Sequence, residues 1–229
     1  MSERRLVIFD CDGVLVDSEP VSVAVLIEVI REAGVEIDES VVYQRFLGRS
    51  MAAVVEFLQD EHGVRFDAAR IAAMRERLYA RFRAELKAVP GVAEMLGRLG
   101  HRVCVASSSQ PERIRLSLEV TGLLAFFEPH IYSSSMVESG KPAPDLFLHA
   151  AQAMGEDPDD CVVIEDSPAG IEAATRAGMR VFAFVGGAHA GPAGLRQRVQ
   201  ALGPDLIFDD MRLLPGLVET SFAAGRAAD

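Results

Sequence analysis

The sequence predicts an α/β protein, a doubly wound parallel sheet with helices inserted after its first strand. From residue 89 onward, short apolar runs alternate with helical segments, which is typical of parallel strands joined by crossover helices. Between residues 18 and 88, in contrast, apolar residues recur only at helical spacing. We therefore expect two domains, a core of residues 1–17 and 89–229 and a helical-bundle cap of residues 18–88.

The composition is that of an ordinary globular protein, with 49% apolar residues, 25% charged residues and a net charge of −11. Such an acidic chain is not expected to bind nucleic acid or an anionic membrane, although a local cluster of cations can still bind a small anion. No apolar run approaches the roughly 20 residues of a membrane span, and no signal-peptide pattern precedes Leu6. Three cysteines without metal-type spacing indicate a reducing compartment, so we expect a cytoplasmic protein.

The first expected strand, Leu6–Phe9, is apolar throughout and should be buried on both faces. Asp10, Asp12 and Gly13 follow it directly. Two carboxylates at the end of a buried strand are unfavourable unless a cation or hydrogen bonds hold them, and ligands bind at the carboxyl ends of parallel strands. An Asp-Gly turn beside a solvated acid is the alternative. The second acid and the position after a strand favour a functional site.

Four helices are expected in the cap, because apolar residues recur every three or four positions there, as Ile71 and Met74 do in the last of them. Gly34 follows the first helix as a stop, and Asp38 and Ser50 are expected to cap the second and third. The expected bounds are 21–33, 38–47, 50–62 and 67–86.

Strands and helices alternate in the rest of the core. Proline at the first helical position and glycine after the last turn delimit helices, as Pro111 and Gly122 do. The expected strands are 103–106, 131–132, 161–164, 181–185 and 206–208, and the expected helices are 92–99, 111–121, 144–154, 168–177 and 213–218.

Polar residues also follow two of the later strands. Ser107 comes after one strand, and Glu165 and Asp166 come after another, while Lys141 lies on a loop between them. Each of these signals is weak alone, because a serine there is usually a helix cap and a lysine before proline is usually solvated. Since the carboxyl ends of parallel strands share one edge of the sheet, we expect these residues to meet Asp10 and Asp12.

These motifs, taken in order, resemble those of the haloacid dehalogenase superfamily of phosphotransferases, in its branch of β-phosphoglucomutase-like enzymes and sugar-phosphate phosphatases. The resemblance covers nearly the whole chain and implies a Rossmann-like core with a helical cap. The segment 146–160 is also similar to that of 6-phosphogluconate phosphatases, but it lies outside the specificity loop. The matching motifs are Asp10–Val14, Ser107, Gly140–Pro142 and Glu165–Ser167 with Gly170.

The resemblance implies that Asp10 is a nucleophile that forms an aspartyl phosphate. It implies that Asp12 is the general acid and base, and crowding by other acids is expected to keep it protonated near neutral pH. Lys141 would neutralise Asp10 and the phosphate, and Ser107 would donate a hydrogen bond to a phosphoryl oxygen.

A metal ion is expected because a phosphate dianion and a carboxylate repel each other by about 4 kcal/mol per charge pair at about 4 Å in a partly screened site. Oxygen ligands select Mg²⁺. The resemblance implies that Asp10, Asp166, Glu165 and the backbone carbonyl of Asp12 hold it.

Three classes of function are compatible with these residues: a Mg²⁺-dependent phosphatase of a sugar, sugar-acid or polyol phosphate, a β-phosphoglucomutase, and a binding protein whose site has decayed. The third is least favoured because every core residue is present. The mutases carry a histidine and a cap arginine at positions that are Ser22 and Met51 here, which favours hydrolysis.

The remaining substrate contacts are expected from the cap loop and the serine run. We expect Gly48, Arg49, Ser50 and Ser108 to join Ser107 and Lys141 around a small phosphorylated substrate. Arg49 would bind a second acidic group of the substrate; the alternative is a solvated side chain or an ion pair with Asp60 or Glu61. The five histidines stand apart from the motifs and are expected to be structural. The sequence does not indicate an oligomeric state, and a monomer is compatible with it.

Overall fold

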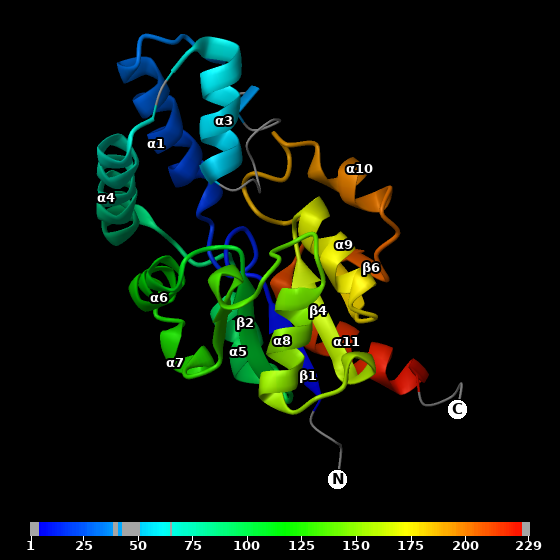
Figure 1. Cartoon of the computed structure of the whole chain (residues 1–229). Helices are drawn as coiled ribbons and strands as arrows, with labels where there is room; N and C mark the ends of the chain where they lie inside the picture. Colours follow the sequence, from blue (N-terminus) through cyan, green and yellow to red (C-terminus); the bar gives the residue numbers. More distant parts are fainter. Residues whose placement is uncertain (1–4, 39–40, 43–50, 65, 226–229) are drawn as a thin grey trace.

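A six-stranded sheet forms the centre of the computed structural model, which describes residues 5–38, 41–42, 51–64 and 66–225 (Figure 1). Neighbouring strands follow the order β3-β2-β1-β4-β5-β6, and every pairing is parallel. The predicted α/β fold with a doubly wound parallel sheet is therefore confirmed. The strands are β1 (Leu6–Phe9), β2 (Arg102–Ser107), β3 (Ile131–Ser133), β4 (Cys161–Glu165), β5 (Arg180–Phe184) and β6 (Leu206–Phe208).

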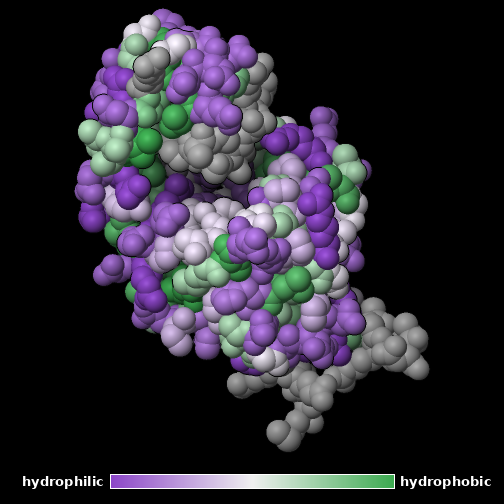
Figure 2. All heavy atoms as spheres, viewed as in Figure 1, coloured by the Kyte–Doolittle hydropathy of each residue, from purple (hydrophilic) through white to green (hydrophobic). Residues whose placement is uncertain are grey.

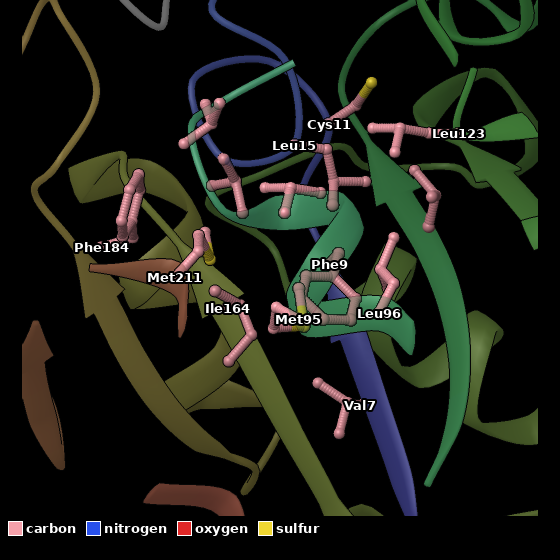
Figure 3. Packing of buried hydrophobic residues seen from close by; sticks show 14 of the residues in the cluster. Val7, Phe9, Cys11, Leu15, Met95, Leu96, Leu123, Ile164, Phe184 and Met211 are labelled. Carbon is pink, nitrogen blue, oxygen red and sulfur yellow. The ribbon is translucent and has the colours of Figure 1, made fainter. Parts of the chain in front are cut away.

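The first strand lies at the middle of the sheet and is fully buried, as its apolar sequence predicts. Because side chains alternate along a strand, Val7 and Phe9 join one apolar cluster while Leu6 and Ile8 join the other. Figure 3 shows part of the first cluster, with Phe9 near Met95 and Leu96. The core helices that contribute to the first cluster are α5 (Val92–Arg98), α6 (Pro111–Val120), α7 (Leu124–Phe127) and α11 (Leu214–Gly225), and those of the second are α8 (Asp145–Met154), α9 (Pro168–Arg176) and α10 (Leu195–Gln200).

Three helices, named the cap here, lie beyond one end of the sheet, at the top of Figure 1. They are α1 (Glu19–Glu32), α3 (Met51–His62) and α4 (Ala68–Glu85). A separate apolar cluster that includes Ile30, Leu58 and Met74 joins them. Ion pairs such as Arg81 with Glu28 also connect α1 and α4, but such exposed pairs contribute at most about 1 kcal/mol each, so burial holds the cap together.

The two chain segments between the cap and the sheet lie side by side. The amide of Asp17 donates to the carbonyl of Lys87, and the amide of Val89 donates to the carbonyl of Leu15, both at 3.0 Å. Because the chain leaves the core and returns to it at nearly the same place, the helices between are inserted without interrupting the sheet. The domain boundaries at residues 18 and 88 stay a prediction.

Most expected elements are present, with ends that differ by one or two residues, but α11 runs to Gly225, seven residues beyond the expected end at 218. Asp67 caps α4, accepting a hydrogen bond from the amide of Arg70 at 2.7 Å. Most of the expected helix 38–47 lies outside the described residues. The short helices α7 and α10 were not predicted, because four to six residues carry too little periodicity to identify a helix. No helix among the described residues is long and apolar enough to cross a membrane.

All three cysteines are buried and unpaired, and we expect them to be unreactive in the native chain. Burial raises the pKa of Cys161 to about 12, and burial also raises that of Cys104 and Cys11, so the reactive thiolate is scarce at neutral pH. A thiol-specific dye should therefore label no cysteine within minutes, and all three after denaturation. Rapid labelling of the folded chain would contradict this burial.

Candidate active site at the carboxyl ends of the strands

The site is a cavity of about 580 Å³ between the cap and the carboxyl ends of β1, β2 and β4. The space-filling view in Figure 2 shows the hollow between these two parts of the molecule. Because β1 lies between β2 and β4, the residues that end these strands come together. The predicted residues that line the cavity are Asp10, Asp12, Ser107, Ser108, Lys141, Glu165 and Asp166.

Lys141 lies among the acids of this cavity, and its side chain is only 3% exposed. Its Nζ donates to Asp10 Oδ1 at 2.6 Å, to Glu165 Oε1 at 2.5 Å and to the carbonyl of Ala106 at 3.0 Å. Burial alone would lower the pKa of Lys141, but the charges of the two carboxylates raise it above its ordinary value. The ammonium group therefore stays charged and holds the two acids together.

Asp10 is 7% exposed and ends the central strand. Burial raises its pKa well above the ordinary value; Lys141 opposes this effect, while Glu165 and Asp166 add to it. Only Oδ1 of Asp10 accepts a hydrogen bond from the described residues, which leaves Oδ2 without one. A carboxylate with one fixed and one unpartnered oxygen is suited to attack or to bind a cation.

Glu165 is fully buried, and both of its oxygens already accept hydrogen bonds. Oε2 accepts from the amides of Asp166 and Ser167 and from the Ser167 hydroxyl, at 2.9–3.0 Å, and Oε1 accepts from Lys141. A Cβ at Gly170 would collide with this carboxyl group, which explains the glycine of the motif. Ser167 also caps α9 through the Gly170 amide. Glu165 thus orients Lys141 and the loop before α9.

Asp166 meets a residue that the sequence did not place in the site. Nε2 of His189 lies 2.9 Å from Asp166 Oδ2, without the alignment of a regular hydrogen bond, and His189 is 1% exposed. Burial alone would lower the pKa of His189, but Asp166 raises it. The expectation that every histidine lies apart from the motifs is therefore wrong for His189. It follows β5, the neighbour of β4, which was the available signal.

Asp12 is surrounded by donors and not mainly by acids. Its Oδ1 accepts from Ser18 Oγ at 2.6 Å and from Arg113 Nη2 at 2.9 Å, and its Oδ2 accepts from Ser109 Oγ at 2.5 Å. Burial would raise the pKa of Asp12, but the charge of Arg113 and the hydrogen bonds lower it below the ordinary value. The expected protonated Asp12 is thus corrected: in this arrangement it is a carboxylate.

Other cavity residues were also missed by the sequence analysis. Glu19 lines the cavity from the start of α1, and burial, aided by the charge of Asp12, raises the pKa of Glu19 to about 7. Arg75 and Tyr79 line it from α4, one helical turn apart. Helical spacing on α4 could have indicated a shared face, but not that this face turns toward the sheet.

The serine run is brought to the cavity as expected. Ser107 is 1% exposed, and its hydroxyl accepts a hydrogen bond from the Ser109 amide at 3.2 Å. Ser108 and Ser109 line the cavity beside it. The predicted contacts Gly48, Arg49 and Ser50 lie outside the described residues.

The donor set fits a hard cation only with help from backbone and substrate. Among the described residues, no three side chains of His, Cys, Asp or Glu are grouped closely enough to hold a metal by themselves. Asp10 and Asp166 each keep an oxygen without a hydrogen bond from those residues, and carboxylates are the ligands that Mg²⁺ prefers. Carbonyl, phosphate and water oxygens commonly complete such sites.

Comparison with known proteins settles the family. The model of the haloacid dehalogenase-like hydrolases matches residues 4–178. The chain belongs to this family. A curated relative, the 6-phosphogluconate phosphatase of Escherichia coli (strain K12), is 32% identical over 193 residues, which cover 84% of this hydrolase and 87% of that protein.

Two solved structures extend the likeness to the whole fold. A haloacid dehalogenase-like protein of unknown function from Agrobacterium tumefaciens is 34% identical with a TM-score of 0.83, over 95% of this hydrolase and 99% of that chain. A family hydrolase from Deinococcus radiodurans, with bound phosphate and sodium, is 32% identical with a TM-score of 0.78. The match covers 96% of this hydrolase and 98% of that chain. The predicted family and the predicted enzyme class, a phosphatase of this family, are confirmed.

Proposed function

We propose that this hydrolase is a Mg²⁺-dependent phosphatase of a small sugar, sugar-acid or polyol phosphate, acting through an aspartyl phosphate on Asp10. The observation that carries the proposal is the pairing of buried Asp10 with Lys141 on the wall of a cavity. One oxygen of Asp10 is held by Nζ at 2.6 Å, and the other has no hydrogen-bond donor among the described residues. Two relatives support the substrate class by their names, the 6-phosphogluconate phosphatase of Escherichia coli and a phosphorylated carbohydrates phosphatase of Thermotoga maritima, which is 30% identical over 204 residues.

Mg²⁺ would be held by Asp10, Asp166 and the backbone carbonyl of Asp12. When bound, it supplies positive charge that offsets the repulsion between the substrate dianion and the Asp10 carboxylate. Glu165 is left out of this set because both of its oxygens already accept hydrogen bonds, through which it fixes Lys141 and the loop that carries Asp166.

The chemistry requires two displacements at phosphorus. Asp10 attacks first, so that its bond to phosphorus forms while the bond to the leaving oxygen breaks, and Asp12 gives that oxygen a proton. Water then attacks the aspartyl phosphate and passes a proton to Asp12, and Asp10 is restored as phosphate leaves. Lys141 holds Asp10, and Ser107 donates to a phosphoryl oxygen. As an acid, Asp12 must first take up a proton, because it is a carboxylate in the arrangement described.

The cavity favours a small substrate. Its volume of about 580 Å³ lies within the range of roughly 300–1,000 Å³ found for small-molecule sites. Glu19, Arg75 and Tyr79 supply polar groups on the cap side, while Ile71 and Leu78 supply apolar surface. Mixed polar and apolar lining is suited to the hydroxyl groups and carbon chain of a sugar derivative.

We expect hydrolysis and not isomerisation, because Ser22 stands where the mutases carry a histidine. The enzyme should release inorganic phosphate from members of a panel of sugar, sugar-acid and polyol phosphates with Mg²⁺, and chelation by EDTA should abolish the release. β-Glucose 1-phosphate with a trace of bisphosphate belongs in the same panel, assayed for phosphate and for glucose 6-phosphate. Rapid accumulation of glucose 6-phosphate would identify a mutase instead, and full activity in EDTA would contradict the role of the metal.

A further inference from the structure

Arg113 joins the candidate catalytic groups to the cap. It lies on α6 of the core, lines the cavity and is 22% exposed. Its Nη2 lies 2.9 Å from Asp12 Oδ1 and 3.4 Å from the hydroxyl of Ser22 on α1. Its guanidinium carbon lies 5.2 Å from the centre of the Phe82 ring on α4. One side chain of the core thus contacts the Asp12 carboxylate and two of the cap helices.

Among the three described side chains that donate to Asp12, Arg113 alone is charged and planar. The hydroxyls of Ser18 and Ser109 can rotate about their C–O bonds, whereas a guanidinium group presents its donors in a fixed plane. The ring of Phe82 limits the orientations of that plane. Arg113 is therefore the donor best able to set the direction in which the Asp12 carboxyl group points.

One unused donor of Arg113 argues against a purely stabilising role. Its Nε is buried and finds no hydrogen-bond partner among the described residues. A guanidinium group placed only for stability would be expected to use this donor, because burying an unpaired N–H is unfavourable. The side chain is placed so that Nη2 reaches Asp12, although this leaves Nε without a partner among the described residues.

We propose that Arg113 is a positioning residue that orients the Asp12 carboxyl group toward the oxygen of the leaving group and links this orientation to the cap through Ser22 and Phe82. The proposal rests on the proposed role of Asp12 as proton donor. Arg113 itself neither attacks phosphorus nor transfers a proton. Because the charge of Arg113 favours the carboxylate form of Asp12, removing Arg113 does not hinder proton uptake by Asp12. A loss that grows with the need for proton donation would therefore report the lost orientation of the Asp12 carboxyl group.

The test compares two substrates of one enzyme, a sugar phosphate and an aryl phosphate with an activated leaving group, which needs little protonation. Arg113→Met should lower kcat for the sugar phosphate by about 100-fold, which is the lower end of the range that general acid catalysis contributes. For the aryl phosphate it should lower kcat by less than about tenfold. KM should change little for either. Arg113→Lys, which keeps the charge without the planar fork, should show the same selectivity with a smaller loss.

Arg115 offers a matched control on the same helix. It is 48% exposed and forms an ion pair with Glu128 away from the cavity residues, so Arg115→Met should behave as the wild type toward both substrates. Equal losses on both substrates in Arg113→Met and Arg113→Lys would overturn the proposal and leave Arg113 as a structural link.

A double-mutant cycle separates this proposal from the proposed function. If Arg113 acts through Asp12, adding Arg113→Met to Asp12→Asn should cause no further loss on the sugar phosphate. Losses that multiply would overturn the inference while the role of Asp12 stands. If Asp12→Asn slows both substrates equally, the proton-donor role of Asp12 fails, and the inference fails with it.

Discussion

Asp10→Asn is expected to lower kcat by more than about a thousandfold, because an amide cannot form the aspartyl phosphate. The fold should survive the change. Lys141 keeps its partner Glu165. The neutral amide also avoids the cost of burying a charge, the effect that raises the pKa of Asp10. The measurement is phosphate release from a sugar phosphate, with the thermal midpoint recorded for both proteins.

A matched control is available for this prediction. Asp159 is exposed and lies before β4, at the other end of the strand from the cavity, so Asp159→Asn should leave turnover unchanged. Activity of Asp10→Asn within tenfold of the wild type would contradict the covalent mechanism. Full loss of activity with a collapsed thermal midpoint would instead point to a structural role for Asp10.

Lys141→Met should lower the free energy of unfolding by about 3–5 kcal/mol near pH 8, because it leaves two buried carboxylates without their cation. The Nζ of Lys141 lies within 2.6 Å of both Asp10 and Glu165, and all three side chains are at most 10% exposed. Turnover should be lost as well, since the charge that holds Asp10 disappears.

The destabilisation should shrink as the pH falls. Asp10 already has a pKa above its ordinary value in the folded chain, and losing Lys141 raises it further. A carboxyl group with a raised pKa binds a proton more readily when folded, so its penalty is full above the folded pKa, shrinks as the pH falls below it and is gone below the pKa of the unfolded chain. Urea unfolding at pH 8 and pH 5, in EDTA, measures the difference.

Lys87 is the control for this variant. It is exposed, and its one hydrogen bond with the described part of the chain is made by its backbone carbonyl, which accepts from the Asp17 amide. Lys87→Met should change stability by less than about 0.5 kcal/mol at either pH. An equally small loss for Lys141→Met, or a loss that grows toward pH 5, would contradict the account of the buried acids.

The fold was predictable because its signals are local. The apolar run Leu6–Phe9 is a strand buried on both faces, and the alternation after residue 89 is a parallel sheet, as expected. Polar residues at strand ends meet at one edge for the same reason, since parallel strands place their carboxyl ends together. Short helices such as α10 were beyond this reasoning, because their patterns are too brief to identify.

What the sequence by itself determined is the set of groups that end the strands: Asp10, Asp12, Ser107, Glu165 and Asp166, together with Lys141. The acids and Ser107 stand at the ends of apolar runs or directly after them, so that strand position alone brings them together, whereas Lys141 was placed by its Gly-Lys-Pro motif. The tertiary structure decided which partners they meet. Arg113 reaches Asp12 from α6, and His189 reaches Asp166 from the loop after β5. These contacts join residues 101 and 23 positions apart, and they depend on strand order and loop path, which no local pattern encodes. The charge of Asp12 followed from them: the sequence shows acids nearby, whereas the folded chain surrounds that carboxylate with donors.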